Sequence, residues 1–321
     1  MPSAPRPASS PALAAASPGG ILYALGCFSI WGLFPVYFKW LQHVSALEVL
    51  AHRIVWSAVL LLALIGWRGE GQALLDALRD PRRLRFYLCT TLLIAANWLL
   101  YIWTVQNDRL LEASLGYYIN PLVNVLLGVL VLGERLQPRH WLAVAIATVG
   151  VLILVVGHGA FPWISLTLAL SFGGYGLLRK KDGHAAILGL GVETVILAPV
   201  ALLFLLVVGV RGDGAFGALD RGTDGLLAAA GLVTVIPLVM FLEAGRRLHL
   251  SVVGLIQYLT PTLQFLLAVL VYREPFTALH FAAFSCIWLA LSVYSADTYL
   301  MYRRRLRQNA AAGLERQETP L

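Results

Sequence analysis

The chain has 321 residues, of which 59% are hydrophobic and only 13% are charged, and its mean hydropathy is +0.76. A water-soluble domain of this composition could not cover its surface with polar groups, so the soluble classes of protein are excluded. The formal net charge of +7 would suit a nucleic-acid-binding protein, but the distribution of the charges along the chain argues against one.

Ten apolar segments have the length of a membrane-spanning helix, which needs about 20 residues. In chain order they are residues 20–39, 46–66, 86–106, 111–132, 139–157, 160–178, 185–210, 224–244, 251–272 and 277–299. The sequence therefore predicts an all-α polytopic membrane protein with ten transmembrane helices. Residues 1–19, rich in proline, alanine and serine, are predicted to form a disordered tail, and residues 302–321 to form a basic tail.

Lysine and arginine are divided unevenly between the two sides of the predicted bundle. One side carries clusters such as those at residues 79–85, 179–181, 246–247 and 303–307. The other side carries Lys39, Arg109, Arg211, Arg221 and Arg273. By the positive-inside rule, this bias predicts that both termini lie in the cytoplasm. Anionic lipid headgroups account for the basic faces, so we expect the lipid bilayer as a partner and no nucleic acid.

Two stretches of the chain repeat each other at a distance of 140 residues. Residues 113–143 and 253–283 align without a gap and share a tyrosine, a proline, a glutamate and a histidine. Each half of the chain contains five predicted spans, so the second half must enter the membrane from the opposite side. We therefore expect residues 20–157 and 160–299 to be inverted five-helix repeats, which are typical of secondary transporters with a site near the membrane midplane.

The repeat places Arg53 opposite Glu193, and both lie inside predicted spans. A central arginine costs at least about 2.5–3.5 kcal/mol on insertion scales. Arg53 is therefore predicted to hold an anionic group or to join a buried ion pair, with Glu48 and His52 nearby; the alternative is that it reaches the external headgroups. Glu193 is the candidate proton carrier, and the alternative is a protonated glutamate that hydrogen-bonds a neighbouring helix.

Prolines lie beside amides in the fourth and ninth predicted spans. Pro121 and Pro261 are expected to break their helices, because proline frees a backbone carbonyl that a cavity or another helix must satisfy. The predicted polar lining of that cavity comprises Asn97, Tyr118, Asn120, Asn124, Gln257, Tyr258 and Gln264. The alternative for these side chains is interhelical hydrogen bonding, worth about 0.6 kcal/mol each.

Trp31 and Tyr175 align in the first span of each half, at an offset of 144 residues. Both could stack on an aromatic or cationic substrate, whereas the alternative is packing or an interfacial belt. The chain contains no GxxxxGK[ST], GxSxG or HExxH motif. We therefore expect no cofactor, no metal, no direct use of ATP and no enzyme activity.

The motifs of the spans resemble one family in combination. They include IWGLFPVYFK at 30–39, HRIVWS at 52–57, ANWLLYIW at 96–103, EASLGYYINPLVNVLLG at 112–128, SFGGYGLLRKK at 171–181, ET at 193–194, TVIPL at 234–238 and GLIQYLTPTLQFLL at 254–267. This set resembles the RarD branch of the EamA-like permeases, in the drug/metabolite transporter superfamily. The resemblance covers residues 20–299. It implies ten helices, a bacterial inner-membrane location and transport of a small molecule, with chloramphenicol sensitivity as the traditional label of the family.

These observations lead to one main hypothesis and two alternatives. The main hypothesis is a secondary transporter that moves a small metabolite or drug-like molecule by alternating access, coupled to protons or another gradient, with export the favoured direction. One alternative is a membrane-embedded lipid-modifying enzyme that uses Glu48, His52 and Arg53. The other is a non-transporting membrane partner or sensor. The sequence leaves the substrate and the oligomeric state open.

Overall fold

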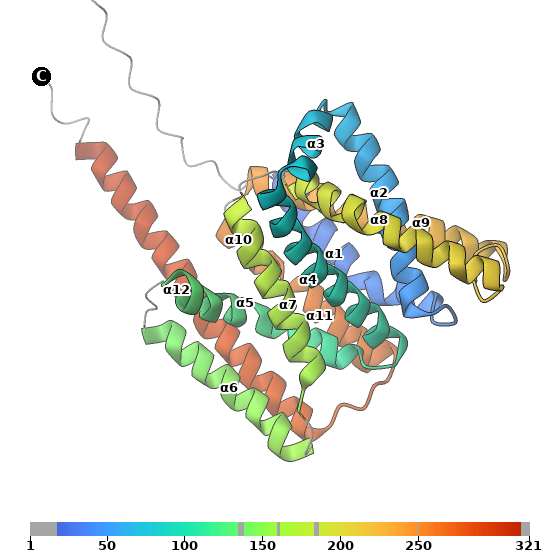
Figure 1. Cartoon of the computed structure of the whole chain (residues 1–321). Helices are drawn as coiled ribbons and strands as arrows, with labels where there is room; N and C mark the ends of the chain where they lie inside the picture. Colours follow the sequence, from blue (N-terminus) through green and yellow to red (C-terminus); the bar gives the residue numbers. More distant parts are fainter. Residues whose placement is uncertain (1–17, 134–137, 159–160, 183–185, 249, 316–321) are drawn as a thin grey trace, which may run out of the picture.

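The computed structural model describes residues 18–133, 138–158, 161–182, 186–248 and 250–315, and these residues form helices joined by short connections (Figure 1). The first half contains α1 (Pro18–Trp40), α2 (Ala46–Trp67), the short α3 (Gly71–Arg79), α4 (Pro81–Gln106), α5 (Leu110–Leu132) and α6 (Pro138–His158). The second half contains α7 (Trp163–Asp182), α8 (Ala186–Arg211), α9 (Arg221–Arg247), α10 (Leu250–Ile256), α11 (Leu259–Leu266), the π-helical turn η1 (Leu267–Val271) and α12 (Ala278–Glu315).

Nine segments of the described chain are long and apolar enough to cross a membrane, and they coincide with nine of the ten predicted spans. The remaining predicted span, residues 160–178, corresponds to α7, a helix of 20 residues. Its apolar part is short because three glycines and a basic end interrupt it. The multi-pass, all-helical class is therefore confirmed for the described residues, while the tenth crossing stays a prediction.

The two ends of the chain differ from the predicted boundaries. The predicted N-terminal tail lies outside the described residues, apart from Pro18 and Gly19, which begin α1. At the other end, α12 continues as a helix to Glu315 and projects beyond the rest of the bundle (Figure 1). The boundary predicted near residue 299 therefore does not coincide with a helix end.

The helices pack in a small set of pairs. At one edge of the molecule α6 lies beside α12, and at the opposite edge α2 packs against α8 and α9 (Figure 1). Between these edges, α5 packs against α7 and α1 packs against α9 and α11. Small residues permit the closest crossings: a Cβ at Gly231 would lie 2.6 Å from the backbone of Trp56, and a Cβ at Gly116 would lie 2.7 Å from the carbonyl oxygen of Ser165.

The two prolines have different effects on their helices. In an α-helix the carbonyl of Gln257 would accept from residue 261, but Pro261 has no N–H, and this carbonyl accepts instead from Thr260 at 3.1 Å. The helix is accordingly interrupted at Gln257 and Tyr258, between α10 and α11. By contrast, α5 continues through Pro121, so the break expected there is absent. A proline inside a transmembrane helix bends it without ending it when neighbouring helices support both halves.

Candidate functional site

A cavity of about 370 Å³ lies between the two halves of the bundle. This volume falls within the range of about 300–1,000 Å³ that small-molecule sites occupy. The described residues of α6 and α12 contribute nothing to its wall. The lining comes from α1, α2, α4, α5, α7, α8, α9 and the α10–α11 segment, and comprises Phe28, Trp31, Phe34, Arg53, Ile94, Asn97, Trp98, Tyr101, Tyr117, Asn120, Pro121, Phe172, Tyr175, Arg179, Leu190, Thr234, Leu238, Phe241, Gln257, Tyr258, Thr260, Pro261 and Gln264.

Arg53 on α2 is 6% exposed and lines this cavity. Its Nε donates to Thr234 Oγ1 of α9 at 2.9 Å, and its guanidinium lies 4.0 Å from the ring centroid of Trp98 on α4. Among the described residues Arg53 forms no ion pair, and its Nη atoms donate to no protein acceptor. A buried cation that lacks a carboxylate partner is costly in a membrane protein.

Aromatic rings form a continuous row along the cavity. Tyr101 lies 5.6 Å from Tyr117, Tyr117 lies 6.2 Å from Phe172, and Phe172 lies 6.4 Å from Tyr175, measured between ring centroids. On another part of the wall, Trp31 lies 5.6 Å from Phe241. These rings give the cavity broad apolar faces on which a planar molecule could stack.

The predicted amides connect helices and also line the cavity. Asn97 Nδ2 donates to the carbonyl of Leu168 and to Ser171 Oγ of α7, at 3.1 and 2.9 Å. Gln264 Nε2 donates to the carbonyl of Trp31 at 3.3 Å and to the hydroxyl of Tyr101 at 3.0 Å. The acceptor atoms Gln264 Oε1 and Asn120 Oδ1 are buried without a partner among the described residues. The same side chains therefore form hydrogen bonds between helices and line the cavity.

Glu193 on α8 is 1% exposed and lies behind the cavity wall. The hydroxyl of Tyr175, itself a lining residue, donates to Glu193 Oε2 at 3.0 Å. Arg179, one turn after Tyr175 on α7, also lines the cavity and packs its guanidinium against Gly189, where a Cβ would lie 1.9 Å from Nη2. The hydroxyl of Tyr175 thus connects the carboxyl group of Glu193 to the cavity.

Four predicted site residues lie away from the cavity. Glu48 accepts from the backbone N–H of Ala215 at 2.7 Å, and the ring of His52 lies 4.9 Å from that of Phe216, so both support the α8–α9 connection. The hydroxyl of Tyr118 lies 2.8 Å from Thr262 Oγ1, at the α5–α11 crossing. Asn124 is exposed beside Gly173, so it too is absent from the lining.

Several lining residues are not among those that the sequence singles out. Arg179 belongs to a basic cluster that the charge pattern assigns to a cytoplasmic connection, although it falls within α7. Trp98 and Tyr101 follow Asn97 at i+1 and i+4, so the helical period could have placed Tyr101 with Asn97 on one face. Tyr117 aligns in the repeat with Gln257, a predicted lining residue, and this alignment could have identified Tyr117 as a lining residue. Among the described residues there is no group of His, Cys, Asp or Glu suited to a metal ion.

The lining residues of the cavity differ in exposure. Arg53, Tyr101 and Gln264 are buried. Phe172 and Gln257 are exposed.

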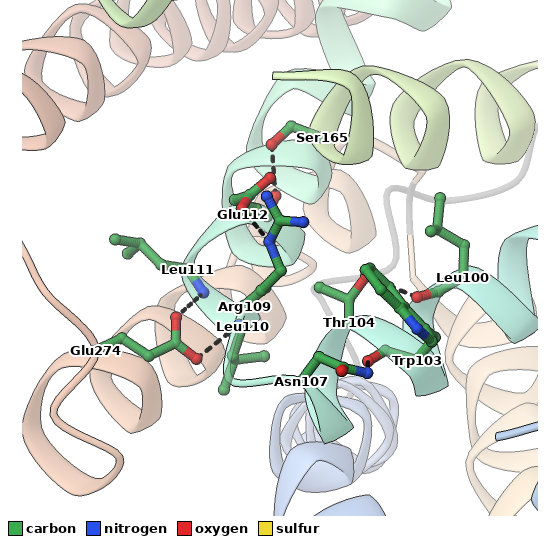
Figure 2. A network of polar contacts seen from close by, with 10 residues as sticks. All are labelled: Leu100, Trp103, Thr104, Asn107, Arg109, Leu110, Leu111, Glu112, Ser165 and Glu274. Carbon is green, nitrogen blue, oxygen red and sulfur yellow. Dashed lines mark hydrogen bonds and ion pairs between the residues drawn. The ribbon is translucent and has the colours of Figure 1, made fainter. Parts of the chain in front are cut away.

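Polar contacts join helices near the α4–α5 connection (Figure 2). Glu274, in the connection before α12, accepts from the backbone N–H groups of Leu110 and Leu111 at 2.7 Å each, and so caps the N-terminus of α5. Lys39 of α1 forms an ion pair with Asp108. Ser165 of α7 donates to the carbonyl of Glu112 at 2.7 Å. We call the contact of Glu274 with Leu110 and Leu111 the α5 cap.

The α5 cap predicts a measurable pH dependence of stability. Burial raises the pKa of Glu274, and the N–H groups of Leu111 and Leu110 lower it by less. The folded protein therefore binds a proton at Glu274 more tightly than the unfolded chain does. The contribution of this difference to the free energy of unfolding is complete below the ordinary pKa of glutamate, and it is lost as the pH rises through the raised pKa of Glu274. The stability of the wild type relative to Glu274→Gln should be greater at about pH 5 than at about pH 8 in thermal unfolding. A relative stability that grows with pH would contradict this assignment.

Comparisons with known proteins agree with this architecture. Residues 18–156 match the model of the EamA-like transporter family. The chain is 46% identical to "Protein RarD" of Streptomyces exfoliatus, over 91% of this chain and 93% of the relative. It is 42% identical to "Protein RarD" of Escherichia coli, over 89% and 96%. It is 32% identical to "Chloramphenicol-sensitive protein RarD" of Pseudomonas aeruginosa, over 90% and 97%. A solved structure at 18% identity shares the fold with a TM-score of 0.56, covering 85% of this chain and 96% of that chain.

Proposed function

Because this chain belongs to the EamA-like transporter family, and to its RarD branch, we propose that it is a secondary transporter that carries a small molecule through the central cavity by alternating access. The observation that carries the proposal is the central cavity itself. Eight helical segments enclose it, and polar contacts join the helices near the α4–α5 connection. Such a cavity is the expected form of a transporter in one of its two access states.

The helix contacts support an inverted repeat of 20–157 and 160–299. In the register of the repeat, α1 corresponds to α7, α4 to α9, and α5 to the α10–α11 segment. The contact of α1 with α9 then corresponds to that of α7 with α4, and the contact of α5 with α7 corresponds to that of α11 with α1. The pairs α2–α8 and α6–α12 correspond to themselves. We infer that the two halves move against each other around the cavity.

The charge bias supports an inner-membrane orientation with both termini in the cytoplasm. Arg179, near the end of α7, lies towards the side with the basic connections, and we propose that the cavity opens in that direction. The described state is then open to the cytoplasm, and the α5 cap belongs to the external seal. In this orientation an export cycle begins with loading from the cytoplasm.

We further propose that Glu193 carries the coupling proton. Its contact with Tyr175 supplies a route by which its protonation state could alter the cavity wall. A transport cycle that alternately exposes and buries such a carboxyl group can move protons.

The function can be tested before the substrate is identified. Proteoliposomes of the purified protein, incubated with a bacterial metabolite extract under a pH gradient, should accumulate one or more compounds above the level in protein-free liposomes, as measured by mass spectrometry. Chloramphenicol should be added to the extract, because the name of one relative refers to it. Accumulation that is independent of the protein would contradict the proposal.

The same preparation separates the two alternatives. A lipid-modifying enzyme would generate new products in detergent, where no gradient exists. A partner or sensor would neither accumulate nor convert any compound. Glu48 and His52, the residues that an enzyme would use beside Arg53, contact the α8–α9 connection outside the cavity, which favours transport.

A further inference from the structure

The chemistry of the cavity wall points to a narrow class of ligand. We propose that the cavity binds a small organic anion, a carboxylate attached to a planar apolar group, with the carboxylate on Arg53 and the planar group against the aromatic row. This inference deepens the proposed function, because it names the substrate class of the same site.

The charges around the cavity favour an anion. Two cationic side chains, Arg53 and Arg179, line it, and the described lining contains no aspartate or glutamate. Glu193 lies behind the wall and contacts it through Tyr175. A cationic ligand would therefore meet a lining that has no carboxylate, whereas an anion would compensate Arg53, for which the described residues supply no ion pair.

The geometry of Arg53 favours a carboxylate. Thr234 holds Nε, and Trp98 stacks on the guanidinium, so two contacts from different helices fix the plane of the group. The remaining two nitrogens form a fork that matches the two oxygens of a carboxylate. Because Arg53 is 94% buried and lines the cavity, the ligand would meet it in a water-poor setting, where a charge-assisted hydrogen bond is strongest.

The rest of the wall sets the shape of the ligand. Tyr101 and Tyr117 are the rings of the aromatic row on helices α4 and α5, and Phe172 and Tyr175 extend it along α7. An acid with an aromatic or other flat apolar group would use both the cation and these faces. The unpartnered acceptors Asn120 Oδ1 and Gln264 Oε1 would in addition favour a ligand that carries a hydroxyl or N–H donor.

The test compares three ligands of similar shape on the purified full-length protein: 3-phenylpropionate, its amide and 3-phenylpropylamine. Binding is measured by tryptophan fluorescence, for which Trp31 and Trp98 lie in the wall, and by thermal unfolding. We expect the carboxylate to bind at least about tenfold more tightly than the amide, and the amine to bind most weakly. Equal or tighter binding of the amide or amine, or no binding of any of the three, overturns the inference.

The variants assign the preference to Arg53. Arg53→Met should remove the preference for the carboxylate over the amide, while Arg53→Lys should retain part of it. Arg246→Met is the matched control, because Arg246 is 70% exposed and pairs with Glu243 at the end of α9, and it should keep the wild-type preference. If Arg53→Met folds and keeps the preference for the carboxylate, the inference is wrong. If Arg53→Met does not fold, the wild type is compared with Arg53→Lys. A lysine variant whose preference equals that of the wild type contradicts binding of the carboxylate by the two guanidinium nitrogens.

Transport of the same three ligands separates this inference from the proposed function. Flux of the amide or amine in proteoliposomes without flux of the carboxylate contradicts the inference and supports a transporter. Tight binding of the carboxylate without flux of any of the three ligands, or of any compound in the extract, supports the inference and contradicts the transporter.

Discussion

Replacement of Arg53 by methionine is expected to lower substrate transport by about 100-fold, because removing one partner of a buried charge pair costs about 2–5 kcal/mol and 1.4 kcal/mol corresponds to tenfold. Arg53 is the buried cation that contacts from two other helices hold in place in the cavity wall. The methionine side chain keeps much of the apolar stem but offers no hydrogen-bond donor. The measurement is the initial rate of uptake into proteoliposomes, for the compounds that the wild-type protein accumulates.

The stability of the same variant distinguishes a functional Arg53 from a structural one. A structural ion-pair partner would destabilise the protein when removed, by about 3–5 kcal/mol for a buried pair. Arg53 has no such partner among the described residues, so the ligand-free methionine variant should unfold at the same temperature as the wild type or at a higher one. Arg246→Met serves as the control for both measurements. A variant that transports normally, or that is severely destabilised, would contradict the role of Arg53 as a ligand anchor.

Replacement of Glu193 by glutamine is expected to lower the accumulation driven by a pH gradient at least about tenfold. Exchange of substrate without a gradient should continue. Glutamine preserves the size of the side chain and can still accept from Tyr175, but it cannot bind or release a proton. The experiment compares gradient-driven uptake with equilibrium exchange in the same proteoliposomes.

The matched control for this variant is Glu243→Gln. Glu243 lies in α9 beside Arg246 and Arg247, at 3.2 and 3.0 Å, and outside the cavity lining. The Glu243→Gln variant should leave both the gradient-driven uptake and the equilibrium exchange unchanged. If Glu193→Gln retains uptake driven by the gradient, another group carries the proton; if it loses exchange as well, Glu193 has a structural role.

The sequence predicted the helical membrane class and much of the cavity wall, because these follow from apolar length and from the repeat. Arg53 could be selected from the sequence because a charge inside a membrane-spanning helix is energetically costly. The structure places Arg53 in the cavity wall. Pro261 likewise predicted the interruption at Gln257, because the freed carbonyl follows from local chemistry.

The rest of the site depends on packing that sequence spacing does not contain. Glu48 and His52 are neighbours of Arg53 along the chain, but α2 turns them towards the α8–α9 connection. The charge pattern assigned Arg179 to a basic cytoplasmic connection, yet Gly189 leaves room for its guanidinium beside the cavity. Pro121 stays within an intact helix, because α5 is supported along its length by α7 and α11.

The central claim, that one cavity opens in turn to both sides of the membrane, can be tested by the access of a single cysteine. Leu238 lines the cavity on α9, and Leu238→Cys can be introduced after Cys27, Cys89 and Cys286 are replaced. Labelling rates with a membrane-impermeant thiol reagent are measured in right-side-out and inside-out vesicles. We predict labelling from both sides, faster from the cytoplasmic side. Glu274→Ala removes the α5 cap and should raise the external rate at least about fivefold while lowering the cytoplasmic rate. Labelling from one side alone, unchanged by Glu274→Ala, would contradict alternating access through this cavity.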